Sequence, residues 1–187
     1  MRANRLSPGR LEAFSDGVIA VIITVLVLEL KVPEPSGIAG LRAVVPTVFL
    51  YLLTFVQIGI YWVNHHYLTD ELETVNHGIL WSNLAFLFCL SLFPFVTLWV
   101  GEKHLSSFST ALYAGVSILP GASYRLLWGC IRRRSDSPAH ASHGKQLTSL
   151  ALYAAAVPAA YVRPALSLSL VSVVAVMWLM PPRRAQE

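Results

Sequence analysis

The sequence has few charged residues: Asp, Glu, Lys and Arg make up 13% of its 187 positions. Soluble domains carry roughly 25% charged residues, so an ordinary water-soluble enzyme or binding domain is excluded. Hydrophobic residues make up 55% of the chain, and its mean hydropathy is +0.58. At about 20 residues per membrane span, this length allows about six spans with short loops. The composition therefore predicts an all-α integral membrane protein, with one six-helix domain over residues 1–187.

Several chemical signatures are also missing. The two cysteines, Cys89 and Cys130, lie in apolar stretches and are expected to be buried thiols without a disulfide. No nucleophile or metal-ligand set accompanies the acidic residues and histidines, so we expect neither enzyme activity nor a cofactor. The segment TVGYG, which builds the carbonyl filter of the usual potassium channel, is absent. We attribute the net charge of +4 to loop arginines that set membrane topology, and we expect no nucleic-acid partner.

Prolines and polar segments divide the chain into six predicted helices. Pro33 and Pro35 are expected to end the first helix, and Pro181 and Pro182 the last, because proline lacks the backbone N–H of a helical residue and disfavours helix at the residue before it. The predicted helices cover residues 8–31, 41–67, 77–100, 107–131, 145–162 and 165–180. The first three contain nearly all of the polar residues expected inside the membrane, so we expect the last three to serve as scaffold.

The basic residues predict the orientation in the membrane. With six spans, both termini share a side with the loops after the second and fourth helices. That side carries ten Lys and Arg residues, which are Arg2, Arg5, Arg10, Arg125, Arg132, Arg133, Arg134, Lys145, Arg183 and Arg184. The other side carries four, which are Lys31, Arg42, Lys103 and Arg163. Cytoplasmic loops are enriched in Lys and Arg, so both termini are predicted to be cytoplasmic.

The first helix carries a stripe that suits the lining of a pore. Gly17, Val21, Thr24 and Leu28 are spaced i, i+4, i+7 and i+11, which places them on one face of a helix. Glu29 follows at the mouth, where a ring of carboxylates would concentrate cations. The alternatives are a stripe that contacts lipid or packs on other helices, and a Glu29 that is merely solvated at a helix end. The pattern alone leaves these alternatives open.

Polar residues also gather at three helix ends that alternate in direction and therefore meet on one side of the membrane. We expect them to form a hydrogen-bonded cluster that fixes the first helix against the next two. Its expected members are Arg10, Phe14, Ser15, Asp16, Trp62, His65, Trp81 and Asn83. His65 and His66 point about 100° apart on a helix, so we expect one in the cluster and one at the interface, without a shared metal ion.

A motif at the start of the first helix resembles the signature of a known family. The motif is R-x-x-x-F-S-D, followed by Gly-Val and by a threonine eight positions after the aspartate. Its residues are Arg10, Phe14, Ser15, Asp16, Gly17, Val18 and Thr24. Together with YWVNHHYL around His65 and LWSNLAFLFCLSLFPF in the third helix, it is similar to the transmembrane protein 175 potassium channel family. The resemblance covers the first three helices, whereas the last three agree only in length and number.

The resemblance implies a potassium-permeable cation channel of the bacterial plasma membrane, a homotetramer with one six-helix unit per chain. It implies that the first helix lines the pore and that its narrowest point falls on Val21, with Leu28 further out and Val25 as a further candidate. Thr24 matches a threonine layer implicated in ion preference, so the permeant K⁺ is expected near Thr24. The family often has isoleucine or leucine where this chain has Val21.

Physical reasoning agrees with a hydrophobic gate. Four copies of one helix around a symmetry axis can enclose a pore, and rings of valine and leucine block ions by expelling water. Threonine hydroxyls replace only part of the hydration of an ion, so we expect weak selectivity for K⁺ over Na⁺. The alternative is a proton-leak or proton-modulated channel on the same scaffold, in which His65, His66 or Asp16 titrates. A carrier would need paired inverted repeats, and none is found.

Overall fold

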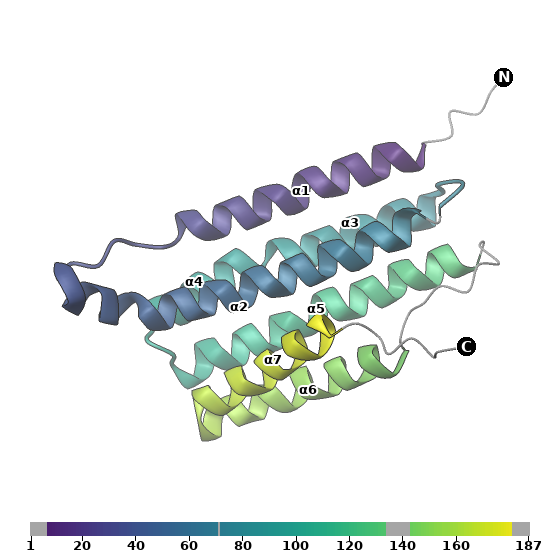
Figure 1. Cartoon of the computed structure of the whole chain (residues 1–187). Helices are drawn as coiled ribbons and strands as arrows, with labels where there is room; N and C mark the ends of the chain where they lie inside the picture. Colours follow the sequence, from purple (N-terminus) through teal and green to yellow (C-terminus); the bar gives the residue numbers. More distant parts are fainter. Residues whose placement is uncertain (1–6, 71, 134–142, 181–187) are drawn as a thin grey trace.

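The computed structural model describes residues 7–70, 72–133 and 143–180, and these residues form a bundle of helices (Figure 1). The helices are α1 (Pro8–Leu28), α2 (Gly37–Asp70), α3 (His77–Ser91), α4 (Phe93–Glu102), α5 (Ser107–Arg132), α6 (His143–Val162) and α7 (Pro164–Leu179). The predicted all-α fold is therefore confirmed for the described residues. Of the basic residues counted for orientation, Arg2, Arg5, Arg134, Arg183 and Arg184 lie outside the described residues.

The predicted third helix is two helices, α3 and α4, which meet at Leu92. Pro94 occupies the first turn of α4, where its missing N–H is tolerated. A continuous helix would need that N–H to bond the carbonyl of Leu90, and the proline ring would clash with the same carbonyl. Together the two helices still form one apolar segment, His77–Glu102, whose 26 residues are enough to cross a membrane.

Three helical segments are long and apolar enough to cross a membrane by length and composition. They are α1, α2 and the combined segment α3–α4, whereas α7 is a shorter apolar helix. The prediction of six spans thus has direct support for three of them, and the spans in α5, α6 and α7 stay a prediction.

α1 lies at one edge of the bundle, and α6 and α7 lie at the opposite side (Figure 1). The neighbours of α1 are α2, α3 and α4, while α5 packs against α3, α4, α6 and α7. The buried residues of α1 follow one stripe at spacings of three or four, which are Leu11, Ser15, Ile19, Ile22 and Leu26. Since lipid tails are as apolar as these side chains, van der Waals packing and hydrogen bonds, more than burial itself, must hold α1 to its neighbours.

α1 is shorter than predicted because it ends at Leu28, with Glu29 as its C-cap. The proline at 33 disfavours helical backbone at the residue before it, and the chain runs without helix until Gly37. Gly40 lets α2 start close to this connection, because a Cβ there would lie 1.9 Å from the carbonyl oxygen of Pro35. The connection between α1 and α2 therefore packs closely against the first turn of α2.

Candidate functional site

The face of α1 that carries the proposed pore stripe is exposed within one chain. Val21 is 59% exposed and Leu28 is 79% exposed, and Gly17, Thr24 and Val25 are exposed as well. The opposite face holds the buried stripe that contacts α2, α3 and α4. The described residues of the subunit therefore leave this face uncovered, and it is available for lipid or for another copy of the chain.

Two further residues extend this exposed face toward the start of α1. Arg10 and Phe14 are exposed, and they precede Gly17 with spacings of four and three. The full series repeats every seven residues, with alternating spacings of four and three. It consists of Arg10, Phe14, Gly17, Val21, Thr24 and Leu28. A heptad repeat is the spacing by which helices pack around a common axis. We call this series the α1 seam.

Thr24 is the polar residue in the middle of the seam. Its Oγ1 donates a hydrogen bond to the backbone carbonyl of Val21 at 2.9 Å. Because the hydrogen is used in this bond, the lone pairs of the exposed hydroxyl oxygen remain available as acceptors. An acceptor without a formal charge suits a partly hydrated monovalent cation.

Three buried side chains link α1, α2 and α3 at the other face of α1. Asn83 Nδ2 donates to Ser15 Oγ at 2.9 Å, and Ser15 Oγ donates to the carbonyl of Leu11 at 2.8 Å. Asn83 Oδ1 lies 2.8 Å from His65 Nε2. Since the amide nitrogen of Asn83 already donates to Ser15, its oxygen is the acceptor and Nε2 of His65 carries the hydrogen. His65 also stacks on Phe86, with ring centres 5.6 Å apart.

A second pair of contacts joins α1 to α2 nearer the surface. Trp62 Nε1 donates to Asp16 Oδ1 at 2.9 Å, and His66 Nδ1 lies 3.0 Å from Glu12 Oε1. The rings of Trp62 and His66 stack on each other. Glu12 did not belong to the predicted cluster, although its position four residues before Asp16 places both on one side of α1.

The structure brings together five of the predicted cluster residues, which are Ser15, Asp16, Trp62, His65 and Asn83. Among the described residues, it does not bring Arg10, Phe14 and Trp81 into this network. Arg10 and Phe14 lie on the seam, away from Ser15, and Trp81 is 70% exposed on α3. The physical reason is helical geometry, because sharing one end of the membrane does not place residues on the same face of a helix.

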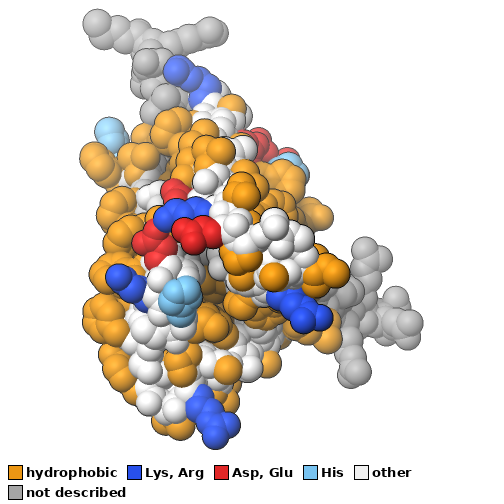
Figure 2. Space-filling model, turned by 90° about the vertical axis from the view of Figure 1, so that its left-hand side faces the viewer, with side chains coloured by type: hydrophobic (Ala, Val, Ile, Leu, Met, Phe, Trp, Pro, Cys, Tyr) orange, Lys and Arg blue, Asp and Glu red, His pale blue; other side chains and the backbone are white. Residues whose placement is uncertain are grey.

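Charged residues gather at the far end of the bundle, where the connection from α1 to α2 lies. Figure 2 views this end and shows acidic and basic side chains close together near its centre. Lys31 forms an ion pair with Glu102 at the end of α4, and this hydrogen bond and charge raise the pKa of Lys31 above its ordinary value. Glu29 is partly exposed beside them. A pocket of about 300 Å³ opens here, and Glu29, Lys31, Glu102 and Thr97 contribute to its walls. We call it the end pocket.

The expectation that the first three predicted helices contain nearly all of the polar residues inside the membrane is wrong, because α5 and α6 also contribute buried hydrogen-bonded side chains. A chain of buried polar side chains crosses from α2 to α4, α5 and α6, which consists of Thr97, Thr54, Tyr113, Gln57 and Tyr153. The sequence signal for it is Gln57, an amide inside an otherwise apolar stretch of α2. A buried amide needs partners, and tyrosine and threonine at membrane depth in neighbouring helices can supply them.

Comparison with known proteins finds similarity to ion channels. The family model described as the endosomal/lysosomal potassium channel TMEM175 matches residues 10–94. The chain is similar to a potassium channel from Chryseobacterium sp. (strain P1-3), with 38% identity over 187 residues and 97% of both chains covered. It is also similar to a potassium channel from Streptomyces collinus, with 34% identity over 70% of this chain and 71% of that protein.

More distant matches include an animal protein and a solved structure. The human endosomal/lysosomal proton channel TMEM175 is 39% identical over 73 residues, which is 33% of this chain and 14% of the human protein. The crystal structure of a lysosomal potassium-selective channel TMEM175 homolog from Chamaesiphon minutus superimposes with a TM-score of 0.81. Its sequence identity is 28%, and the match covers 92% of this chain and 96% of that chain.

Proposed function

Since the chain belongs to the TMEM175 family of ion channels, we propose that it forms a potassium-permeable cation channel in the bacterial plasma membrane. The bacterial relatives are named potassium channels, and the similar solved structure is named a potassium-selective channel. The family and its structural relatives are ion channels and not enzymes. In our proposal four copies assemble around one axis in the lipid bilayer, with both termini in the cytoplasm.

The α1 seam is the observation that carries this proposal. A helix that faces lipid needs only apolar side chains, with no repeat and no small or polar residue at fixed places. The seam instead places Arg10, Gly17 and Thr24 at one heptad position and Phe14, Val21 and Leu28 at the other, all exposed. Such a repeat on an uncovered face is what four symmetry-related helices around a conduit require.

The rings formed by Val21 and Leu28 would constitute the gate. In the tetramer each ring holds four branched apolar side chains, and a narrow apolar ring excludes water and therefore ions. Thr24 lies between the two rings, about 4.5 Å from Val21 and about 6 Å from Leu28 along the helix axis at 1.5 Å per residue. Val25 lies beside the seam and would contribute to the wall. A small rotation or tilt of α1 would widen the rings and open the pore.

The ring of Thr24 hydroxyls would be the place where K⁺ is partly dehydrated. Four neutral oxygens cannot replace a full hydration shell, so the preference for K⁺ over Na⁺ should be weak. Glu29 is partly exposed just beyond the end of α1, and a ring of Glu29 carboxylates would attract monovalent cations to the mouth. The Ser15–Asn83–His65 contacts would keep α1 fixed on α2 and α3, so that the seam keeps its direction toward the axis.

One observation favours proton permeation as a second candidate. His65 is fully buried, and its Nδ1 has no hydrogen-bond partner among the described residues. A ring nitrogen with a free lone pair can accept a proton that enters this cluster, and the neighbouring Trp62 and His66 on α2 contact the carboxylates of Asp16 and Glu12. The animal relatives that share 73 residues with this chain are named proton channels.

Flux measurements in liposomes separate the two candidates. Purified protein is reconstituted in vesicles in which K⁺, Na⁺ or H⁺ is in turn the only permeant ion. The proposal predicts K⁺ flux, a smaller Na⁺ flux, and little change in K⁺ flux when His65 is replaced by Gln, which keeps a donor for Asn83. A protein that passes H⁺ but no K⁺ would overturn the proposal in favour of the second candidate.

A further inference from the structure

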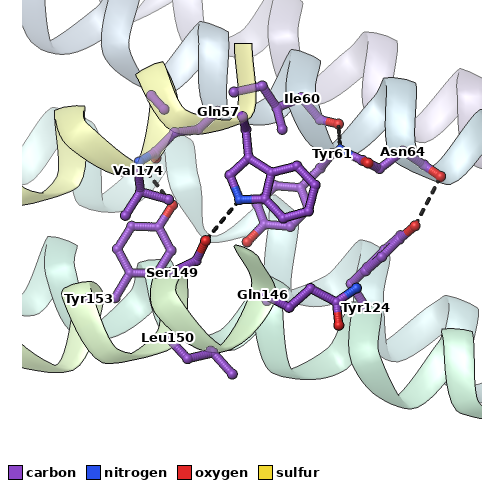
Figure 3. A pocket seen from close by; sticks show the side chains of 13 residues that line it. Gln57, Ile60, Tyr61, Asn64, Tyr124, Gln146, Ser149, Leu150, Tyr153 and Val174 are labelled. Carbon is purple, nitrogen blue, oxygen red and sulfur yellow. Dashed lines mark hydrogen bonds between the residues drawn. The ribbon is translucent and has the colours of Figure 1, made fainter. Parts of the chain in front are cut away.

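A cavity lies inside each subunit, away from the α1 seam, between α2, α5, α6 and α7 (Figure 3). Its volume accessible to the centres of water molecules is about 40 Å³. One water needs roughly 10–15 Å³ of such space, so the cavity has room for water. Its walls combine apolar groups such as Leu150 and Val174 with polar groups from Gln57, Tyr61, Gln146 and Tyr153. We call it the subunit cavity.

The polar groups in the wall have unused hydrogen-bonding capacity. Tyr153 is 3% exposed; its hydroxyl accepts from Gln57 Nε2 at 3.5 Å, but its own hydrogen has no acceptor among the described residues. Gln146 is 8% exposed, and its oxygen accepts from Arg125 while its amide hydrogens have no described acceptor. Polar groups in the wall of a cavity favour water that can bridge them, so these donors favour water in the subunit cavity.

A chain of hydrogen bonds leads from this cavity to the other end of the bundle. Gln57 lines the cavity, and its Oε1 accepts from the Tyr113 hydroxyl at 3.2 Å. The Tyr113 hydroxyl lies 2.9 Å from Thr54 Oγ1, which lies 3.0 Å from Thr97 Oγ1. Thr97 lines the end pocket, which is open at the end of the bundle. Hydrogen-bonding groups therefore connect the two hollows through one subunit.

Four members of this chain are hydroxyls and one is an amide. A hydroxyl can accept a proton on one side and release its own on the other, so a row of hydroxyls can pass a proton along. The Gln57 amide cannot do so, since its oxygen only accepts and its nitrogen only donates. Gln57 uses the oxygen toward Tyr113 and the nitrogen toward Tyr153, so it blocks the row at that point.

We propose that Gln57 closes a second polar path through each subunit, and that it prevents protons from crossing between the water of the subunit cavity and the water of the end pocket. Ions larger than a proton are excluded because the side chains on either side of Gln57 are in direct hydrogen-bond contact. The proposal requires that the subunit spans the membrane, but it does not require a pore on the α1 seam. Gln57 would thus confine conduction to the channel axis.

The test replaces Gln57 by Glu and measures proton flux in liposomes. A carboxylic acid of the same shape can accept a proton on one oxygen and release it from the other, which restores the missing step. A pH gradient drives the flux, and equal K⁺ on both sides with valinomycin holds the voltage at zero. We expect Gln57→Glu to raise the proton flux at least about tenfold above the native protein, with K⁺ flux unchanged.

Two controls show whether protons use this path. Gln146→Glu makes the same chemical change in the wall of the same cavity but outside the chain to Thr97, and it should leave proton flux at the native level. Adding Tyr113→Phe to Gln57→Glu removes a hydroxyl of the row and should abolish the increase. An increase that survives Tyr113→Phe, or an equal increase in Gln146→Glu, would overturn the proposal.

A second variant tests the proposal independently, in case Gln57→Glu folds poorly. Gln57→Ser supplies a hydroxyl and leaves room for a water, so it should also raise proton flux. If either variant assembles normally and conducts no additional protons, the proposal is wrong. In the native protein, magnetisation transfer from water to the Trp178 indole, which lines the cavity, should be detectable by NMR, and a dry cavity would contradict the proposal as well.

K⁺ flux of the native protein, measured in the same vesicles, tests the proposed pore separately. Absence of K⁺ flux with a proton leak in Gln57→Glu would refute the pore and leave the role of Gln57 intact. Normal K⁺ flux without a leak in an assembled Gln57 variant would refute only the role of Gln57.

Discussion

Replacing Val21 by alanine tests the hydrophobic gate with little disturbance of the fold. Val21 is 59% exposed in the subunit, so the truncation opens no cavity in the core, and alanine is the better helix former. Each substitution removes two carbon atoms from the ring. At about 0.8 kcal/mol per apolar carbon, four subunits give a ceiling of roughly 6 kcal/mol for the reduced cost of hydrating the gate. If about a quarter of this ceiling is realised, basal conductance rises about tenfold.

The assay is K⁺ efflux from loaded liposomes, measured per assembled channel. Val27→Ala is the matched control, because Val27 lies on the same helix, is 46% exposed and does not belong to the seam. We expect a rise of about tenfold for Val21→Ala and no rise for Val27→Ala. Equal efflux from both variants and the native protein would remove Val21 from the pore and refute the reasoning.

Three other substitutions test separate parts of the account. Thr24→Val keeps the shape of the side chain and removes the hydroxyl, so the ratio of K⁺ to Na⁺ flux should fall toward one, and an unchanged ratio would exclude Thr24 from ion contact. Ser15→Ala leaves the amide of Asn83 without its acceptor and should lower the free energy of unfolding by about 1 kcal/mol in a thermal or denaturant melt, whereas Ser82→Ala, which removes bonds only to its own helix, should not. Gly40→Ala places a Cβ against the carbonyl of Pro35 and should reduce the amount of folded protein in size-exclusion chromatography. A normal amount of folded protein would show that the backbone between α1 and α2 can move to make room for the Cβ.

Much of the fold follows from local patterns in the sequence. Long apolar runs and flanking prolines are sufficient to place α1, α2 and the α3–α4 segment, because both act within one helix. The break at Leu92 is harder to predict, since a proline inside an apolar segment either kinks a helix or starts a new one. The exact end of α1 at Leu28 is harder to predict, since Pro33 excludes helix only from the residue before it onward.

In the candidate site, too, some contacts follow from patterns in the sequence and others depend on how the helices pack. Alternation of helix direction is sufficient to group Ser15, His65 and Asn83, whose side chains meet in the structure. The position of Arg10 on the seam could have been predicted from the heptad spacing between Arg10 and Leu28, which is present in the sequence. The chain through Gln57 depends on how four helices pack against one another, and no periodicity along one helix reveals it.

The position of α1 in the assembled protein tests the central claim most directly. An electron cryo-microscopy structure of the purified protein in lipid nanodiscs would show the symmetry and the helix nearest the axis. The account predicts four subunits, with the seam from Phe14 to Leu28 facing a continuous central conduit. A seam turned toward lipid, or an assembly without a conduit on its axis, would contradict it.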